Sequence, residues 1–331
     1  MRHDGCREQI DLVRKRHGCL LLSRRSVFCR PTGRATGYVL FLVVCSFGCL
    51  FGVGCRGPQK PIMRPARHSI RSDQLLVLSD FRLPAEHPLI EDLMQLRKQV
   101  SKSLDLPADG DEVVVYLFGN ETQYGQYLGA TYPGLPPRRA YFVGTPKELA
   151  VYTFWGDRIQ EDLRHEYTHG LLHAALKTVP LWLDEGLAEY FEVAGPNPGT
   201  VNTDYAYRLT ALLANGWQPD MNRLERFEEF SQMQRIDYQE SWAWVHYMLH
   251  TTPEAKSALL SYLRDLRTQS QPVPLSVRLE QDHPQVTVRF LNYLASLNTA
   301  SLLSQKPKKE WQPAHLTGEI SEPPAHGTSQ Q

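Results

Sequence analysis

The sequence predicts an α+β fold, in which a mixed β-sheet is followed by one motif-bearing helix and a mainly helical C-terminal half. The sheet is indicated by short β-branched and aromatic runs, of which Val113–Phe118 is the clearest. The helical half is indicated by apolar residues at helical spacing, which dominate from residue 205 onwards. No internal repeat is present, so we expect one domain whose two halves enclose a cleft.

Length and composition limit the possible classes of protein. The chain has 331 residues, of which 42% are hydrophobic, and 36 Lys and Arg balance 36 Asp and Glu. A chain of this size can bury one sizeable core with a small appendage. The balanced charge gives no indication of a nucleic-acid partner or of a charged polymer.

The first 55 residues are predicted to be a basic N-terminus with a signal peptide or membrane anchor. Residues 1–36 carry nine Arg or Lys against three Asp or Glu, and an apolar run at 38–53 follows. This order is typical of an export signal, and the run has a length between those of a cleaved signal and a spanning helix. The basic side stays in the cytoplasm, so everything after residue 55 should lie across the membrane.

The end of this segment resembles a lipoprotein cleavage site, because small residues precede Cys55. Three outcomes stay open: a lipid on Cys55, a signal cleaved without lipid, and an uncleaved anchor. The expected location is the cell envelope, anchored to the membrane, with secretion as the alternative. A start codon assigned too early would explain the long basic stretch, in which case residues 1–36 are untranslated or disordered.

All six cysteines lie at or before residue 55. The exported part therefore has no disulfide framework and no thiolate zinc site, and any metal must be held by His and carboxylate. Residues 56–72 are predicted to be a Pro/Arg-rich linker, residues 73–303 the folded domain, and residues 304–331 a disordered tail.

The elements of the domain follow from hydrophobic periodicity and from Gly/Pro-rich breaks. Strands are predicted at 75–78 and 113–118 and in a hairpin of 140–143 with 148–154. Helices are predicted at 89–104, from 157 to about 179, and at 181–191, 238–250, 254–267 and 284–297.

The spacing His-Glu-x-x-His at residues 165–169 is the one pattern that specifies a chemistry. Helical residues four apart share a face, so His165 and His169 can direct two imidazole nitrogens at one point. Zinc binds neutral imidazole at about 2.0–2.1 Å and leaves one tetrahedral position for water in hydrolytic sites. Glu166 stands beside the first histidine and can act as base for that water. The alternative is two histidines on an amphipathic helix that only pack or face water.

A further ligand is expected from the next helix. Residues 181–191 carry Glu185 and Glu189, which are four apart and share a face in a run of apolar and aromatic residues. One carboxylate could bind the metal while the other accepts a hydrogen bond from a ligand imidazole. The alternative, a surface helix with two solvated glutamates, is disfavoured by the apolar composition.

These motifs resemble the gluzincin metallopeptidases of the thermolysin and aminopeptidase N type. His-Glu-Tyr-Thr-His followed by Trp-Leu-Asp-Glu-Gly is most similar to uncharacterised exported bacterial proteins grouped as peptidase MA-like. The resemblance covers residues 113–250 and implies a zincin-like fold with a zinc cofactor. It also implies Glu185 as the third ligand beside His165 and His169, and Glu189 as the acidic residue that orients the first histidine.

A third block, which opens with Tyr238, is similar to the Tyr-x-x-Gly-aromatic-Ala helix of the aminopeptidase N family, with Ser241 in place of the glycine. The resemblance implies that Tyr238 stabilises the oxyanion, a task that a positioned phenol can perform. The alternative is a tyrosine at the start of a core helix. His173 would lie about 6 Å along the helix axis from His169, too far to share the metal, so we expect it to pack or to support a ligand.

In zincins an edge strand before the zinc helix binds extended substrate by β-addition. The strand at 148–154 occupies that place in the sequence, so Leu149, Val151 and Thr153 are the candidate substrate-binding residues. The alternative is an ordinary closed sheet edge.

The sequence thus predicts a zinc-dependent peptidase with a peptide or protein substrate, in which Glu166 is the base and Tyr238 the oxyanion donor. The Gly-x-Met-Glu-Asn element that binds the free amino end in aminopeptidases does not occur, which favours an endopeptidase. Two other classes stay open: an exported hydrolase of non-peptide substrates and a non-catalytic interaction domain. The oligomeric state is left open.

Overall fold

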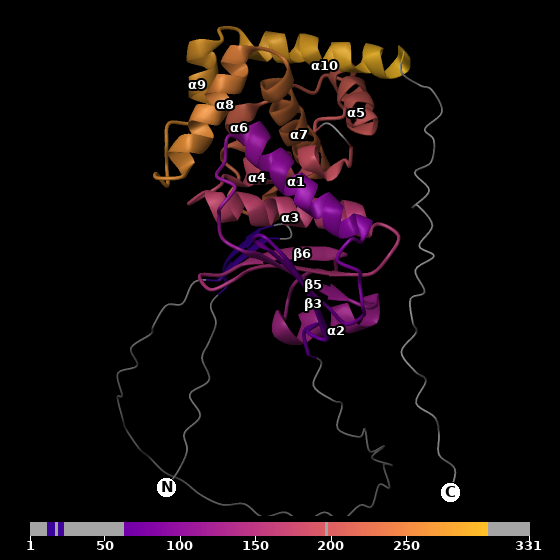
Figure 1. Ribbon diagram of the computed structural model, residues 1–331. Coiled ribbons are helices and arrows are strands. Elements are labelled where there is room, and N and C mark those ends of the chain that lie inside the picture. The colour runs from indigo at the N-terminus through magenta and orange to yellow at the C-terminus, as the bar shows by residue number, and fades with distance from the viewer. Residues whose placement is uncertain (1–11, 17–18, 23–62, 196–197, 304–331) are drawn as a thin grey trace, which may run out of the picture.

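The computed structural model describes residues 12–16, 19–22, 63–195 and 198–303 of the chain (Figure 1). The apolar run at 38–53 of the predicted export signal, Cys55 and the predicted tail at 304–331 lie outside these residues. Among the helices that the structure describes, none is both long and apolar enough to span a membrane.

Seven strands form one mixed sheet. They are β1 (Leu12–Arg16), β2 (Cys19–Leu22), β3 (His68–Ser72), β4 (Leu75–Ser79), β5 (Val113–Phe118), β6 (Ala140–Gly144) and β7 (Leu149–Phe154). Their order across the sheet is β1-β2-β6-β7-β5-β4-β3. The strands β4, β5 and β7 run parallel, whereas β6 pairs antiparallel with β7 and β3 antiparallel with β4. The mixed sheet is therefore as predicted.

Ten α-helices accompany the described strands. They are α1 (Pro88–Leu104), α2 (Glu121–Thr131), α3 (Ile159–Ala175), α4 (Leu181–Glu192), α5 (Thr203–Ala214), α6 (Met221–Leu224), α7 (Arg235–His250), α8 (Pro253–Leu266), α9 (Leu275–Asp282) and α10 (Val286–Leu303). All helices from α4 onwards follow the last strand, so the α+β fold with a helical C-terminal half is confirmed.

Helices cover both faces of the sheet, which explains why the inner strand β5 is a continuous apolar run. Successive side chains of a strand point to opposite faces. In β5, Val113, Val115 and Leu117 join the large core with α1 and α3, while Val114, Tyr116 and Phe118 join a smaller aromatic core with α2. Figure 1 shows α2 on the opposite side of the sheet from α1 and α3.

Several elements differ from the sequence prediction. Strands β1 and β2 lie in the segment that we predicted to be a basic N-terminus with a signal or anchor, and β2 pairs with β6. Residues 68–72, which we assigned to the linker, form β3 and pair with β4, so the folded part begins earlier. Helix α2 was not predicted because its two glycines and scattered apolar residues hide a helical period. Helix α9 was missed because it is short and buries only Leu275 and Leu279.

The strand that was predicted to bind substrate lies inside the sheet. Leu149, Val151 and Thr153 are on β7, which pairs with β5 on one side and with β6 on the other. Both rows of backbone hydrogen-bonding groups are therefore used, and an extended peptide cannot add to this strand. The edge-strand prediction for these residues is wrong.

A glycine sets the distance between the two helices at the centre of the helical half. A Cβ atom at Gly186 of α4 would lie 2.7 Å from the backbone oxygen of Ser241 on α7. Nonbonded atoms do not approach this closely, so only glycine lets the two helix backbones pack at this distance. The neighbouring residue, Glu185, is thus carried on a helix whose position depends on this contact.

We expect Gly186→Ala to lower the free energy of unfolding by about 1–3 kcal/mol, because the added methyl group forces α4 away from α7. Urea unfolding measures the loss. The matched control is Gly125→Ala on α2, where no atom lies within 4 Å of an added Cβ. There the better helix propensity of alanine should stabilise the protein by about 0.5–1 kcal/mol. Equal stability of Gly186→Ala and the unmodified protein would contradict the close packing.

Candidate metal centre

The two histidines of the motif lie on one face of α3, as their spacing requires. His165 is partly exposed, His169 is fully buried, and their ring centroids are 5.0 Å apart. Helix α3 lies close to the sheet, because a Cβ atom at Gly170 would be only 2.7 Å from a methyl group of Val113. The helix is therefore fixed against β5, with His169 beneath the surface.

Glu185 of α4 completes the group. Its Oε2 lies 3.6 Å from His165 Nε2 and 3.9 Å from His169 Nε2. The ligand atoms of these three residues lie within 4.8 Å of one another. Ligands at the usual zinc distances and tetrahedral angles are about 3.3–3.4 Å apart, so a small inward movement would bring all three onto one ion.

Three of the atoms that face the centre have no hydrogen-bond partner in the described part of the chain. His169 Nε2 and both carboxylate oxygens of Glu185 are buried without a hydrogen bond among the described residues. Buried polar atoms are normally paired, and leaving them unpaired costs free energy. A cation at this point would satisfy all of them, so the three residues fit a metal ion.

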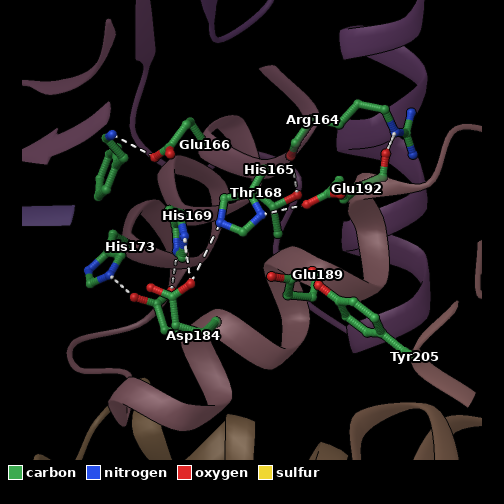
Figure 2. A network of polar contacts seen from close by, with 12 residues as sticks. Arg164, His165, Glu166, Thr168, His169, His173, Asp184, Glu189, Glu192 and Tyr205 are labelled. Carbon is green, nitrogen blue, oxygen red and sulfur yellow. Dashed lines mark hydrogen bonds and ion pairs between the residues drawn. The ribbon is translucent and has the colours of Figure 1, made fainter. Parts of the chain in front are cut away.

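The outer nitrogen of each histidine is held by a carboxylate (Figure 2). His169 Nδ1 donates to Asp184 at 2.9 Å, and His165 Nδ1 donates to Glu192 at 2.9 Å. In a neutral imidazole this places the lone pair on Nε2, which faces Glu185. This is the arrangement that metal-binding histidines usually have. His173 Nε2 also donates to Asp184, at 3.0 Å. His173 therefore supports Asp184, the partner of His169, and does not itself face the centre.

Buried charges shift the proton affinities of these groups. Burial lowers the pKa of His165, but the carboxylates of Glu185 and Glu192 outweigh it, and the net pKa lies well above the ordinary value. Burial raises the pKa of Asp184, yet the two histidines that donate to it bring the net value well below its usual range. The negative charge of these carboxylates therefore favours a cation at the centre, whether a proton or a metal ion.

Glu166 lies at the sheet side of the centre and is 6% exposed. Its Oε2 accepts a hydrogen bond of 2.7 Å from the backbone N–H of Phe142 on β6. Burial raises its pKa, and the opposing effects of His165 and His169 are smaller. A carboxylate with a raised pKa is a stronger base, and the single bond to Phe142 leaves Oε1 available for a proton.

Glu189 does not orient the first histidine, in contrast to the prediction. It accepts a hydrogen bond of 2.8 Å from the hydroxyl of Tyr205, and Glu192, three residues further along α4, accepts from His165. Burial and the charge of Glu192 raise the pKa of Glu189 to about 7. His165, Glu189 and Glu192 also lie within 4.8 Å of one another. These oxygens already accept hydrogen bonds, so this second group fits a metal less well than the first.

The sequence interpretation missed Asp184 and Glu192. Asp184 precedes Glu185 and is fully buried, and its place among large apolar residues, directly after Leu183, was the signal in the sequence that could have indicated it. Glu192 continues the face of Glu185 and Glu189 at the next helical position, seven residues after Glu185. Tyr238 lies in the first turn of α7, partly buried against the large core. Its predicted role at the oxyanion stays a prediction.

A pocket of about 280 Å³ opens beside the centre and is lined by His165, Glu166 and Glu192. Its other lining residues are Arg138, Arg139, Ala140, Arg158, Glu161 and Asp162. Arg139 pairs with Asp162 at 2.9 Å, and Arg158 pairs with Glu161. The approach to Glu166 is thus polar, with a single small apolar side chain.

Comparison with known proteins concerns this part of the chain. Residues 161–274 match a family model described as "Protein of unknown function (DUF1570)". The match includes most of α3 and all of α4 and α7, and leaves out the sheet. No curated protein matches the chain. The matched region therefore coincides with the helices that carry the candidate metal centre, and its description adds no activity.

Proposed function

We propose that this chain is a zinc-dependent peptidase of the gluzincin type, with His165, His169 and Glu185 as the metal ligands. The observation that carries the proposal is the convergence of His169 Nε2 and both unpaired oxygens of Glu185 at one buried point beside His165 Nε2. Two neutral imidazoles and one carboxylate form a set that zinc prefers in hydrolytic sites. The sequence after residue 55 contains no cysteine, which removes thiolate sites from consideration.

A bound zinc ion would supply a Lewis acid at this point. Glu166 is placed to take a proton from the attacking water on Oε1 and to deliver it to the leaving amine, while Phe142 holds Oε2. Asp184 and Glu192 keep the two imidazoles in the orientation that directs Nε2 inward. Tyr238 is proposed to donate a hydrogen bond from its phenol O–H to the developing oxyanion.

The substrate class is proposed to be peptides or proteins cleaved at internal bonds. This choice rests on the motif resemblance and on the missing aminopeptidase element for a free amino end. The polar pocket beside Glu166 would accept polar or charged substrate side chains more readily than large apolar ones. We further propose that the N-terminal segment exports the domain and keeps it at the membrane, through an uncleaved anchor or through a lipid on Cys55. Either route separates residues 12–22 from the domain, so in the exported form the sheet would end at β6 and lack β1 and β2.

The proposal is tested by metal analysis of the full-length protein after dialysis against a weak chelator. We expect one zinc ion per chain, hydrolysis of a mixed peptide library, and loss of both activity and zinc with a strong chelator. His169→Ala should lose the zinc, whereas His250→Ala, whose ring bonds Tyr190 on the far side of α4, should keep it. No zinc in the unmodified protein would refute the proposal. Zinc without peptide hydrolysis would direct attention to non-peptide substrates or to a non-catalytic role.

A further inference from the structure

The residue before the first histidine is a buried arginine. Arg164 of α3 is 1% exposed, and its Nε donates to the backbone oxygens of Phe191 at 2.9 Å and of Glu192 at 3.2 Å. Figure 2 shows Arg164 beside the end of α4, on the side away from Glu166. A fully buried guanidinium is costly unless all its donors are used, so its partners indicate what it does.

The remaining nitrogens of Arg164 bind α1. Nη1 donates to Asp92 at 2.8 Å and Nη2 to Gln99 at 3.3 Å. Gln99 in turn donates to the backbone oxygen of Gly195, just after α4. One side chain of α3 thus connects α1 to the C-terminal end of α4.

Acidic residues at the C-terminal end of α4 are electrostatically unfavourable. The last carbonyl groups of a helix have no partner within it, and the helix dipole places partial negative charge there. Glu189 and Glu192 both lie in this last turn and add negative charge. The positive charge of Arg164 offsets this repulsion, and its Nε–H caps two of the free carbonyls.

Two neighbouring residues of α3 therefore hold Glu192 at two points. Arg164 binds its backbone oxygen, and His165 Nδ1 binds its carboxylate at 2.9 Å. The bond to the carboxylate directs His165 Nε2 toward Glu185. If the last turn of α4 unwound, the carboxylate of Glu192 would leave His165 and the imidazole could rotate.

We propose that Arg164 is a positioning residue for the metal centre, which acts through Glu192 on the orientation of His165. The inference rests on the proposed function, because it assigns to Arg164 an effect on metal affinity. It differs from a purely structural role in one respect. Replacing a purely structural residue lowers the stability of the fold whether or not Glu192 is present. Replacing Arg164 should also weaken metal binding, and this effect on metal affinity should disappear once Glu192 is absent.

The experiment is a double-mutant cycle on zinc affinity, measured by competition with a chromophoric chelator on the full-length protein. Arg164→Lys keeps the positive charge but cannot reach the carbonyls and Asp92 together. We expect it to weaken zinc binding about tenfold, within the 10–100-fold range for residues that support metal ligands. Glu192→Ala should weaken binding by a similar or larger factor. The double variant should bind zinc within about twofold of Glu192→Ala alone, because the two residues act in one chain of contacts.

The matched control is Arg223→Lys, which replaces another arginine that binds two acidic groups, Asp237 and Glu240, away from the centre. It should destabilise the fold in thermal unfolding and leave zinc affinity within about twofold. Arg164→Lys with unchanged zinc affinity, or effects that multiply in the double variant, would overturn the inference while the zinc site itself stands. An unmodified protein that binds no zinc would instead overturn the proposed function, and the cycle distinguishes the two failures.

Discussion

Glu166→Gln is expected to lower kcat for peptide hydrolysis by about 10³-fold, within the range for loss of a general base, and to leave zinc content unchanged. Glutamine has the same shape, and its amide oxygen can still accept the hydrogen bond from the Phe142 N–H. It cannot take a proton from water, so the chemical step slows. Because Glu166 is not among the three converging ligands, the metal should remain. Steady-state kinetics measures kcat with a peptide whose hydrolysis is abolished by a chelator. Zinc analysis of the same sample measures the metal content.

The control for this prediction is Glu161→Gln. Glu161 lies on the same helix and lines the same pocket, but its carboxylate pairs with Arg158 at the surface. Its replacement should change kcat by less than about twofold. If Glu166→Gln kept full activity, Glu166 would not be the base, and a loss of zinc in that variant would show that it acts on the metal instead.

The sequence could predict the parts of the centre that depend on local geometry. His165, Glu166 and His169 share one helix, and a fixed helical period decides which face each side chain takes. The same reasoning within α4 left Glu185 and Glu189 as candidates, and the motif resemblance implied Glu185. The partners of the histidines depend on how α4 crosses α3. That crossing decides whether Glu189 or Glu192 reaches His165, and close contacts such as Gly186 against Ser241 help to set it.

The order of the strands could not be predicted from local sequence, because it too depends on contacts between residues that are distant in the chain. The hairpin of β6 and β7 was predictable from sequence neighbours, but either strand could have been the one that joins the rest of the sheet. The parallel pairing of β7 with β5 decides which strand joins, and it connects residues 36 positions apart, such as Val113 and Leu149. Strand β6 lies beside β7, and its Phe142 donates a backbone N–H to Glu166.

Glu185→Gln is expected to weaken zinc binding by roughly 100-fold or more, since loss of a supporting residue alone costs about 10–100-fold. The amide removes the negative charge from the centre and offers zinc a poorer oxygen ligand. The isosteric change should leave the packing of α4 intact, so the loss belongs to the metal and not to the fold. Zinc affinity by chelator competition, together with circular dichroism of the metal-free protein, separates these effects.

Glu189→Gln provides the matched comparison, because Glu189 lies one turn further along the same helix and is also buried. Its carboxylate accepts from Tyr205 rather than facing His169, and glutamine can accept the same bond. We expect zinc affinity within about fivefold of the unmodified protein. Equal losses in the two variants would favour the alternative group of His165, Glu189 and Glu192 as part of the binding site. If only Glu185→Gln loses zinc affinity, the third ligand is Glu185, whose two oxygens have no hydrogen-bond partner among the described residues and face the imidazoles.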